Sequence, residues 1–204
     1  MAIQLQKGQK INLSKERYGL SKVMVGLGWD EVQRNTGFLS MFKAKPQDID
    51  CDAFAILLGY DGKVLNQATD IKQCTVFFNQ LEWWNGSIKH MGDNLTGAGE
   101  GDDEQIFVDL NNVPNDIGAI VFAVNIYQAF ERGQHFGMIR NAFIRVVDYE
   151  RQVELCRFNL SENYTNQTAL VAGYLVRKED GWEFMTDGSS ARVASLVDVV
   201  SAFA

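Results

Sequence analysis

The chain has 204 residues, of which 46% are hydrophobic and 22% are charged, and its formal net charge is -7. A chain of this length can bury a sizeable core without disulfide staples. Its acidic balance argues against nucleic acid and anionic membranes as partners, because both require clustered Lys and Arg. The three cysteines, Cys51, Cys74 and Cys156, form no CxxC pair, so neither a zinc ribbon nor a dithiol redox motif is indicated.

The sequence offers no segment for a membrane. Its first residues, MAIQLQKGQKINLSKE, lack the apolar centre of a signal peptide. The longest apolar stretch, IGAIVFAVNI, is about half of the ~20 residues that a spanning helix needs. We therefore expect a cytoplasmic protein with no direct membrane insertion.

Short runs of strand composition follow one another along the chain, separated by turn signals such as Asp61-Gly62, Asn85-Gly86, Asp180-Gly181 and Asp187-Gly188. Many short strands with regular turns are typical of an all-β sandwich or barrel. The predicted strands are 22–28, 52–59, 74–78, 104–110, 119–127, 142–148, 153–160, 169–178 and 182–186.

One helix is predicted, at the end of the chain. In SSARVASLVDVVSAFA, apolar residues recur at helical spacing, and Ser189 or Ser190 is available as the N-cap. The recurring positions are Val193, Leu196, Val197, Val200 and Phe203. We expect this helix to cover a sheet face. No linker or repeat interrupts the pattern, which predicts a single domain over residues 1–204.

The segment 90–107, HMGDNLTGAGEGDDEQIF, gathers acids without any positive charge after His90. Calcium prefers six to eight oxygen ligands, and glycines let a loop turn its carbonyls inward. An all-oxygen donor set disfavours zinc and copper, and magnesium usually keeps more of its waters. Calcium is therefore the predicted ligand, the alternative being a solvated acidic turn. The candidate donors are Asp93, Asn94, Thr96, Glu100, Asp102, Asp103 and Glu104.

A second acidic constellation is DIDCDAF, residues 48–54. In an extended strand Asp48, Asp50 and Asp52 would share a face, spaced about 6.6 Å apart, and from Phe54 that face turns apolar. The spacing allows neighbouring carboxylates to converge on one ion. It is not an EF-hand, because Ala53 stands where that loop requires glycine.

Several of these segments resemble the TerD family of bacterial tellurium-resistance and stress-response proteins, including the TerE and TerZ types. They are GLSKVMVGLGWD, DIDCDAFAILL, FFNQ, NGSIKHMGDNLTGAGEGDDEQI and NAFIRVVD. The resemblance runs in order through most of the chain. It implies a β-sandwich of two mainly antiparallel sheets that binds two or more calcium ions and is not an enzyme. It also implies metal ligands at Asp50 and Asp52, in addition to the seven donors of the loop. Other Ter-family proteins, including a membrane-bound member, are the implied partners.

Two rival functions use the same residues. A hydrolase could hold a metal-bound water with the same acids, and a sensor could bind a nucleotide, although no basic residue near the acidic loop favours one. His90 is either an ordinary strand histidine or a hydrogen-bond partner or ligand beside the site. Cys51 is expected to be buried and structural, and Trp83-Trp84 to form a contact surface or a partly packed hairpin tip.

Overall fold

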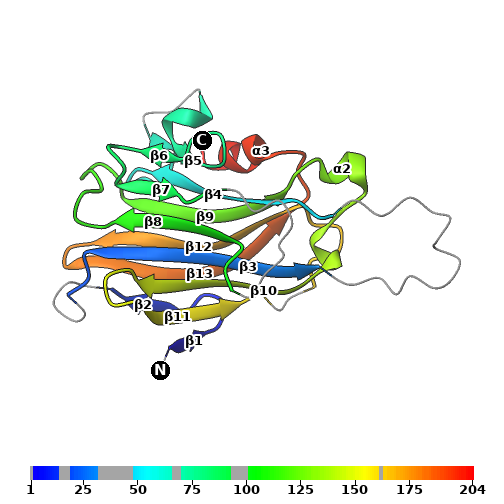
Figure 1. Cartoon of the computed structure of the whole chain (residues 1–204). Coiled ribbons are helices and arrows are strands. Elements are labelled where there is room, and N and C mark those ends of the chain that lie inside the picture. The colour runs from blue at the N-terminus through cyan, green and yellow to red at the C-terminus, as the bar shows by residue number, and fades with distance from the viewer. Residues whose placement is uncertain (1, 14–18, 32–47, 66–69, 93–100, 161–162) are drawn as a thin grey trace, which may run out of the picture.

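The computed structural model describes residues 2–13, 19–31, 48–65, 70–92, 101–160 and 163–204. Its strands form two sheets that lie face to face (Figure 1). Sheet A has the order β1-β11-β10-β3-β8-β7-β6 and sheet B the order β2-β13-β12-β9-β4-β5. Every neighbouring pair is antiparallel except β1 with β11. The predicted two-sheet, all-β architecture is confirmed.

The strand bounds match the sequence pattern closely, and each of the nine predicted strands is present. Sheet A comprises β1 (Ile3–Leu5), β11 (Val153–Asn159), β10 (Ile139–Asp148), β3 (Lys22–Glu31), β8 (Glu104–Asp109), β7 (Ile88–His90) and β6 (Glu82–Trp83). Sheet B comprises β2 (Lys10–Asn12), β13 (Gly181–Ala191), β12 (Ala169–Lys178), β9 (Ala119–Ile126), β4 (Cys51–Leu58) and β5 (Thr75–Val76). The four strands that the sequence did not predict, β1, β2, β6 and β7, have two or three residues each.

The main core lies between the sheets. Alternate residues of β3, such as Val23, Val25 and Leu27, point into it from sheet A, and alternate residues of β4, such as Ala53 and Leu57, contribute from sheet B. The intervening β4 residues face outward, so both faces of this strand are buried. Burial on both faces explains why β4 reads as a continuous apolar run.

The outer face of sheet B is covered by the C-terminal helix α3 (Leu196–Ser201), as the sequence predicted. Leu196, Val199 and Val200 of this helix pack in one apolar cluster with Phe54 and Ile56 of β4, which confirms that this face of the strand is apolar from Phe54 onward.

The start of the helix differs from the prediction. Ser189 and Ser190 belong to β13, and the helix begins after Ser195, whose backbone N–H donates to the Asp198 carboxylate at 2.9 Å. The predicted turn at Asp187-Gly188 is also wrong. It is a bulge within β13, because the register of the β12–β13 ladder shifts there and Gly188 has a φ of +86°.

The remaining helical segments are short: α2 (Ala129–Arg132) and the 3-10 turns η3 (Ile71–Gln73) and η4 (Phe136–Met138). Among the described residues, no helix is both long enough and apolar enough to cross a membrane. Trp83 and Trp84 lie at the β6–β7 hairpin, where Trp84 is 57% exposed and Trp83 is partly packed, as expected of a hairpin tip.

Candidate metal-binding site

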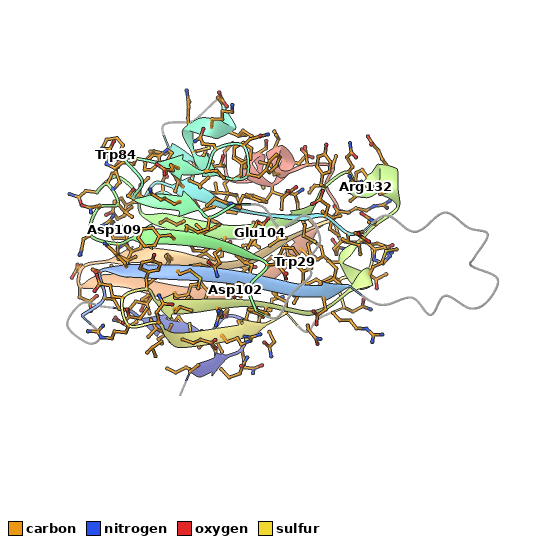
Figure 2. The ribbon with its side chains drawn as sticks, in the orientation of Figure 1. Trp29, Trp84, Asp102, Glu104, Asp109 and Arg132 are labelled. Carbon is orange, nitrogen blue, oxygen red and sulfur yellow. The ribbon has the colours of Figure 1, made fainter. Side chains whose placement is uncertain are left out.

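Five of the nine predicted metal ligands lie in the described part of the chain: Asp50, Asp52, Asp102, Asp103 and Glu104. Asp93, Asn94, Thr96 and Glu100 lie outside it. Figure 2 labels two of the described candidates, Asp102 and Glu104.

Glu104, the first residue of β8, points between the sheets and is buried. Its Oε2 accepts a hydrogen bond of 2.6 Å from the backbone N–H of Ala53 in β4. Since β5 pairs with β4 only at Ala55 and Ile56, the Ala53 amide has no ladder partner on that side within the described chain. The carboxylate of Glu104 takes that place and holds the end of the acidic segment against β4.

His90 completes this contact. Its Nδ1 accepts from the backbone N–H of Gly92 at 3.3 Å, so the ring hydrogen of the neutral form lies on Nε2. Nε2 faces the carbonyl oxygen of Ala53 at 3.1 Å and Oε2 of Glu104 at 3.2 Å. His90 is therefore both a strand residue and a hydrogen-bond partner of a candidate ligand. Together His90 and Glu104 join the two acidic constellations, one residue away from Asp52.

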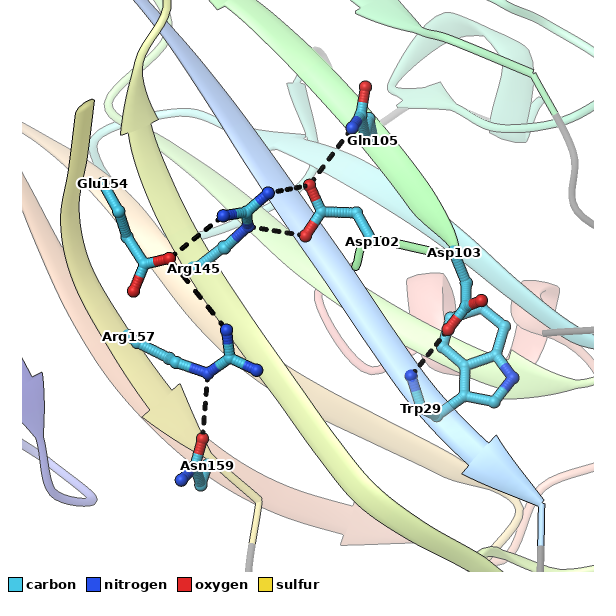
Figure 3. A network of polar contacts seen from close by, with 8 residues as sticks. All are labelled: Trp29, Asp102, Asp103, Gln105, Arg145, Glu154, Arg157 and Asn159. Carbon is cyan, nitrogen blue, oxygen red and sulfur yellow. Dashed lines mark hydrogen bonds and ion pairs between the residues drawn. The ribbon is translucent and has the colours of Figure 1, made fainter. Parts of the chain in front are cut away.

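Asp102 lies on the outer face of sheet A and is bound by an arginine. Arg145 of β10 donates from Nε to Oδ1 at 2.7 Å and from Nη2 to Oδ2 at 2.9 Å (Figure 3). Gln105 donates to Oδ2 at 3.1 Å, and Arg145 also reaches Glu154 at 3.0 Å. The hydrogen bond to Asp102 is the largest cause that raises the pKa of Arg145. The guanidinium of Arg145 already neutralises the charge of Asp102, which weakens the attraction of this carboxylate for a metal ion.

Asp103 is in a different electrostatic position from its neighbour. Its Oδ2 accepts from the backbone N–H of Trp29 at 2.7 Å (Figure 3). Burial raises the pKa of its carboxyl, and the negative charges of Asp30 and Asp102 raise it further against the opposing effect of the Trp29 hydrogen bond. Such a carboxylate gains from a nearby cation.

Asp30 is a candidate ligand that the sequence did not predict. It ends the GLGWD run on β3, and its charge acts on Asp103. Its Oδ2 accepts from Nδ2 of Asn141 at 2.7 Å. Strand alternation along β3 places it on the face of Gly26 and Gly28, opposite Trp29, and that alternation was the signal available in the sequence.

Asp50 and Asp52 are separated from the loop acids by sheet B. Arg132 of α2 approaches Asp50, with Nη1 at 3.7 Å from Oδ2. Asp52 is 5% exposed and pairs in register with Asn125 of β9. By the alternation of β4 its side chain lies on the outer face of sheet B, with Phe54, whereas Glu104 lies between the sheets.

Within the described ranges, no three His, Cys, Asp or Glu side chains are grouped so that they could hold a metal ion. Asp103, on which the charge of Asp30 acts, supplies carboxylate oxygens of the kind that calcium prefers. The other ligands would have to come from the 93–104 segment itself.

The three thiols are buried. Cys51, Cys74 and Cys156 form no disulfide, and the burial of Cys51 agrees with the expectation for it. Burial raises the pKa of Cys74 to about 11 and that of Cys156 to about 12, so both remain protonated and unreactive at neutral pH.

Comparison with known proteins agrees with this fold and these motifs. The model of the TerD domain matches residues 1–203. The chain belongs to the TerD family. It is similar to stress response protein SCP2 of Bacillus subtilis (strain 168), with 45% identity over 100% of both chains.

Other relatives carry tellurium names. Tellurium resistance protein TerX of Serratia marcescens is 40% identical over 97% of each chain. Among solved structures, a homologue of telluride resistance protein (TerD) from Streptomyces coelicolor A3(2) superposes with a TM-score of 0.64 at 20% identity, covering 91% of this TerD-family chain and 99% of the other. At that identity the likeness concerns the fold alone.

Proposed function

We propose that this TerD-family protein binds calcium through the acidic segment 93–104 and acts as a non-catalytic interaction module in tellurium resistance and the stress response. The observation that carries the proposal is the environment of Asp103. Its partly buried carboxylate has two further acids as electrostatic neighbours, Asp30 and Asp102, and Arg145 is already occupied by Asp102 and Glu154.

The proposed ligands are the described Asp103 and Asp30, together with the oxygen donors of the segment before them. Burial and like-charge repulsion together raise the pKa of Asp103, and calcium would offset the repulsion. The hydrogen bond from the Ala53 N–H to Glu104 anchors the end of this segment to β4. An ion bound beside that anchor would fix the segment relative to both sheets, and the folded state would be stabilised by mass action.

The biological context rests on the relatives. Proteins that match nearly the whole chain are named for stress response or tellurium resistance. We infer the same setting here, with other Ter-family proteins, including a membrane-bound member, as partners of the calcium-ordered surface. A pull-down of such partners should then depend on calcium and be lost in chelator.

Calorimetric titration of chelator-treated protein tests the calcium step. Calcium is expected to bind, and magnesium to bind more weakly, because magnesium gives up its waters reluctantly. Asp103→Asn should weaken calcium binding roughly tenfold or more, as a charge-assisted contact is worth about 1.5–3 kcal/mol. Asp116→Asn, which removes an exposed acid elsewhere, is the matched control. The proposal fails if calcium gives no heat, or if the two variants titrate alike.

A further inference from the structure

The outer face of sheet B carries a pocket of about 360 Å³ that the proposed calcium site does not use. It lies where β4 and β9 meet the start of α3, with residues of η3 and α2 and the residues after β5 along its sides. Its walls are largely apolar, and Phe77, Phe78, Tyr127, Phe130 and Leu196 are among the residues that form them. A concave, mostly apolar site of this size with a few polar groups is typical of small-molecule binding.

Two polar side chains lie among these apolar walls. Asp52 and Asn125 sit directly opposite each other in the β4–β9 ladder, and each is only 5% exposed. Oδ1 of Asn125 is fully buried, and no described residue donates a hydrogen bond to it. A buried acceptor left in this state costs free energy unless a ligand supplies the donor. This unsatisfied oxygen is the observation that points to a ligand.

The charges around the pocket select the ligand class. Its charged lining residues, in the described chain, are Asp52 and Glu131, and no described Lys or Arg lines it. Two arginines lie nearby: Arg132 is 5.0 Å from the ring centre of Tyr127 and 3.7 Å from Asp50, and Arg192 is 5.4 Å from the ring centre of Phe130. Each of these rings thus already has a cation beside it, whereas the two charged residues of the described lining are acids, and Oδ1 of Asn125 can only accept a hydrogen bond.

We propose that this pocket binds a small organic monocation, a primary amine carried on an aromatic or aliphatic body. The ammonium group has three N–H donors and no acceptor, which matches the carboxylate of Asp52 and Oδ1 of Asn125. The body of the amine packs against the rings, whose faces favour a cation nearby. The apolar walls disfavour a hydrated metal ion, which would need six or more oxygen ligands.

This pocket is separate from the proposed calcium site. Asp52 lies on the outer face of β4, whereas the Glu104 side chain, which accepts from the Ala53 amide, lies between the sheets. The inference therefore goes beyond the proposed function, and amine binding should persist in a chelator.

The experiment titrates phenethylamine into the full chain by calorimetry in the presence of a chelator, with 2-phenylethanol and 3-phenylpropionate as neutral and anionic analogues of similar shape. Phenethylamine should bind about ten- to a hundredfold more tightly than the alcohol, since a hydrogen bond to a charged group contributes that factor. The anionic analogue, 3-phenylpropionate, should not bind. Equal affinity for the amine and the alcohol would overturn the proposal.

Three variants locate the binding. Asp52→Asn should lower amine affinity at least tenfold, whereas Asp61→Asn, an exposed acid after β4, should leave it unchanged. Because Asp52 is buried, Val197→Arg provides an independent test: Val197 is 46% exposed on α3 and lines the pocket, so the new guanidinium should repel the amine without affecting folding. Amine binding unchanged in Val197→Arg or in folded Asp52→Asn would overturn the assignment. Loss of calcium heat with amine binding intact would refute the proposed function alone.

Discussion

The buried polar groups on the outer faces of the two sheets differ in whether the protein supplies their hydrogen-bond partners. On sheet A, the Asp102 carboxylate is fully buried, and its partners fill both oxygens: Arg145 binds it twice and Gln105 once. On sheet B, Asn125 is only 5% exposed, yet its Oδ1 accepts nothing from the described chain. The first arrangement is complete within the protein, and the second is completed only by a ligand.

The contrast distinguishes acids that the protein itself neutralises from acids that it leaves without a cation. An acid that meets a bidentate arginine is already neutralised, whatever motif contains it. Asp102 and Asp103 are neighbours in the same acidic run, but Asp102 has a cation and Asp103 has further acids as its electrostatic neighbours. Position in a motif alone does not distinguish them, and the surroundings do.

The largest loss of stability is expected for a substitution on sheet A. Arg145→Met would leave the Asp102 charge buried without its cation, and removing one partner of such a pair costs about 3 kcal/mol or more. Urea unfolding in chelator measures the loss. Lys10→Met, which breaks an exposed pair with Glu183, should cost less than about 1 kcal/mol. Adding Asp102→Asn to Arg145→Met should restore much of the stability, and a double variant as unstable as the single one would contradict the charge argument.

A somewhat smaller effect is expected at Gly26. A Cβ at this position of β3 would lie 2.3 Å from the carboxylate atoms of Asp102, so the acid must leave the guanidinium to make room. Gly26→Ala should therefore destabilise the protein by about 1–3 kcal/mol, the usual range for overpacking. Gly59→Ala is the control, because its nearest neighbour there is the oxygen of a flexible exposed Asp61 at 3.0 Å. Equal unfolding midpoints for the two variants would show that Asp102 is not held as described.

The glycines of β3 also explain what sequence reasoning could reach. The composition of residues 22–28 identified the strand, in which Val23, Val25 and Leu27 repeat with period two. It gave no reason for Gly26 and Gly28 on the other face. Those glycines are required by the side chains of Asp102 and Phe143, which come from distant parts of the chain. Long-range contacts of this kind leave no local periodicity.

The same limit applies to the candidate site. The acidic segments were found from composition, and Glu104 of one contacts the Ala53 amide beside the other, while Asp50 and Asp52 lie across sheet B from Glu104. The arginine bound to Asp102 could not be predicted, because Arg145 lies 43 positions away. Nor could β6 and β7 be predicted, since strands of two or three residues are too short to show alternation. The predicted helix N-cap at Ser189 or Ser190 was wrong because a bulge at Gly188 lets β13 continue to Ala191.

A smaller change in stability, this time a gain, is expected when Asp103 is replaced. A carboxyl whose pKa is raised by folding stabilises the protein when protonated, and this contribution is lost as the pH rises through the folded pKa. Without calcium, the wild-type protein should therefore lose stability as the pH rises from below the usual carboxyl pKa towards neutrality. Asp103→Asn should reduce that loss and be at least as stable as wild type at pH 7, as measured by urea unfolding across pH. The variant should also lose the stabilisation by calcium. A less stable apo variant at pH 7 would contradict the electrostatic account.

The smallest change in stability is expected when Asn125 is replaced, because its Oδ1 has no hydrogen bond to lose within the described chain. Replacing a buried polar group with an apolar one of similar shape is nearly neutral when the group made no hydrogen bond. Asn125→Leu should therefore unfold within about 1 kcal/mol of wild type, or slightly above it, while amine binding falls. Thr168→Val is the matched control, since the buried Thr168 hydroxyl accepts from Val193 N at 2.8 Å and donates to Val193 O at 2.6 Å, and its loss should cost more. If Asn125→Leu instead proved the more damaging of the two, Asn125 would be a structural residue, and sheet B would resemble sheet A after all.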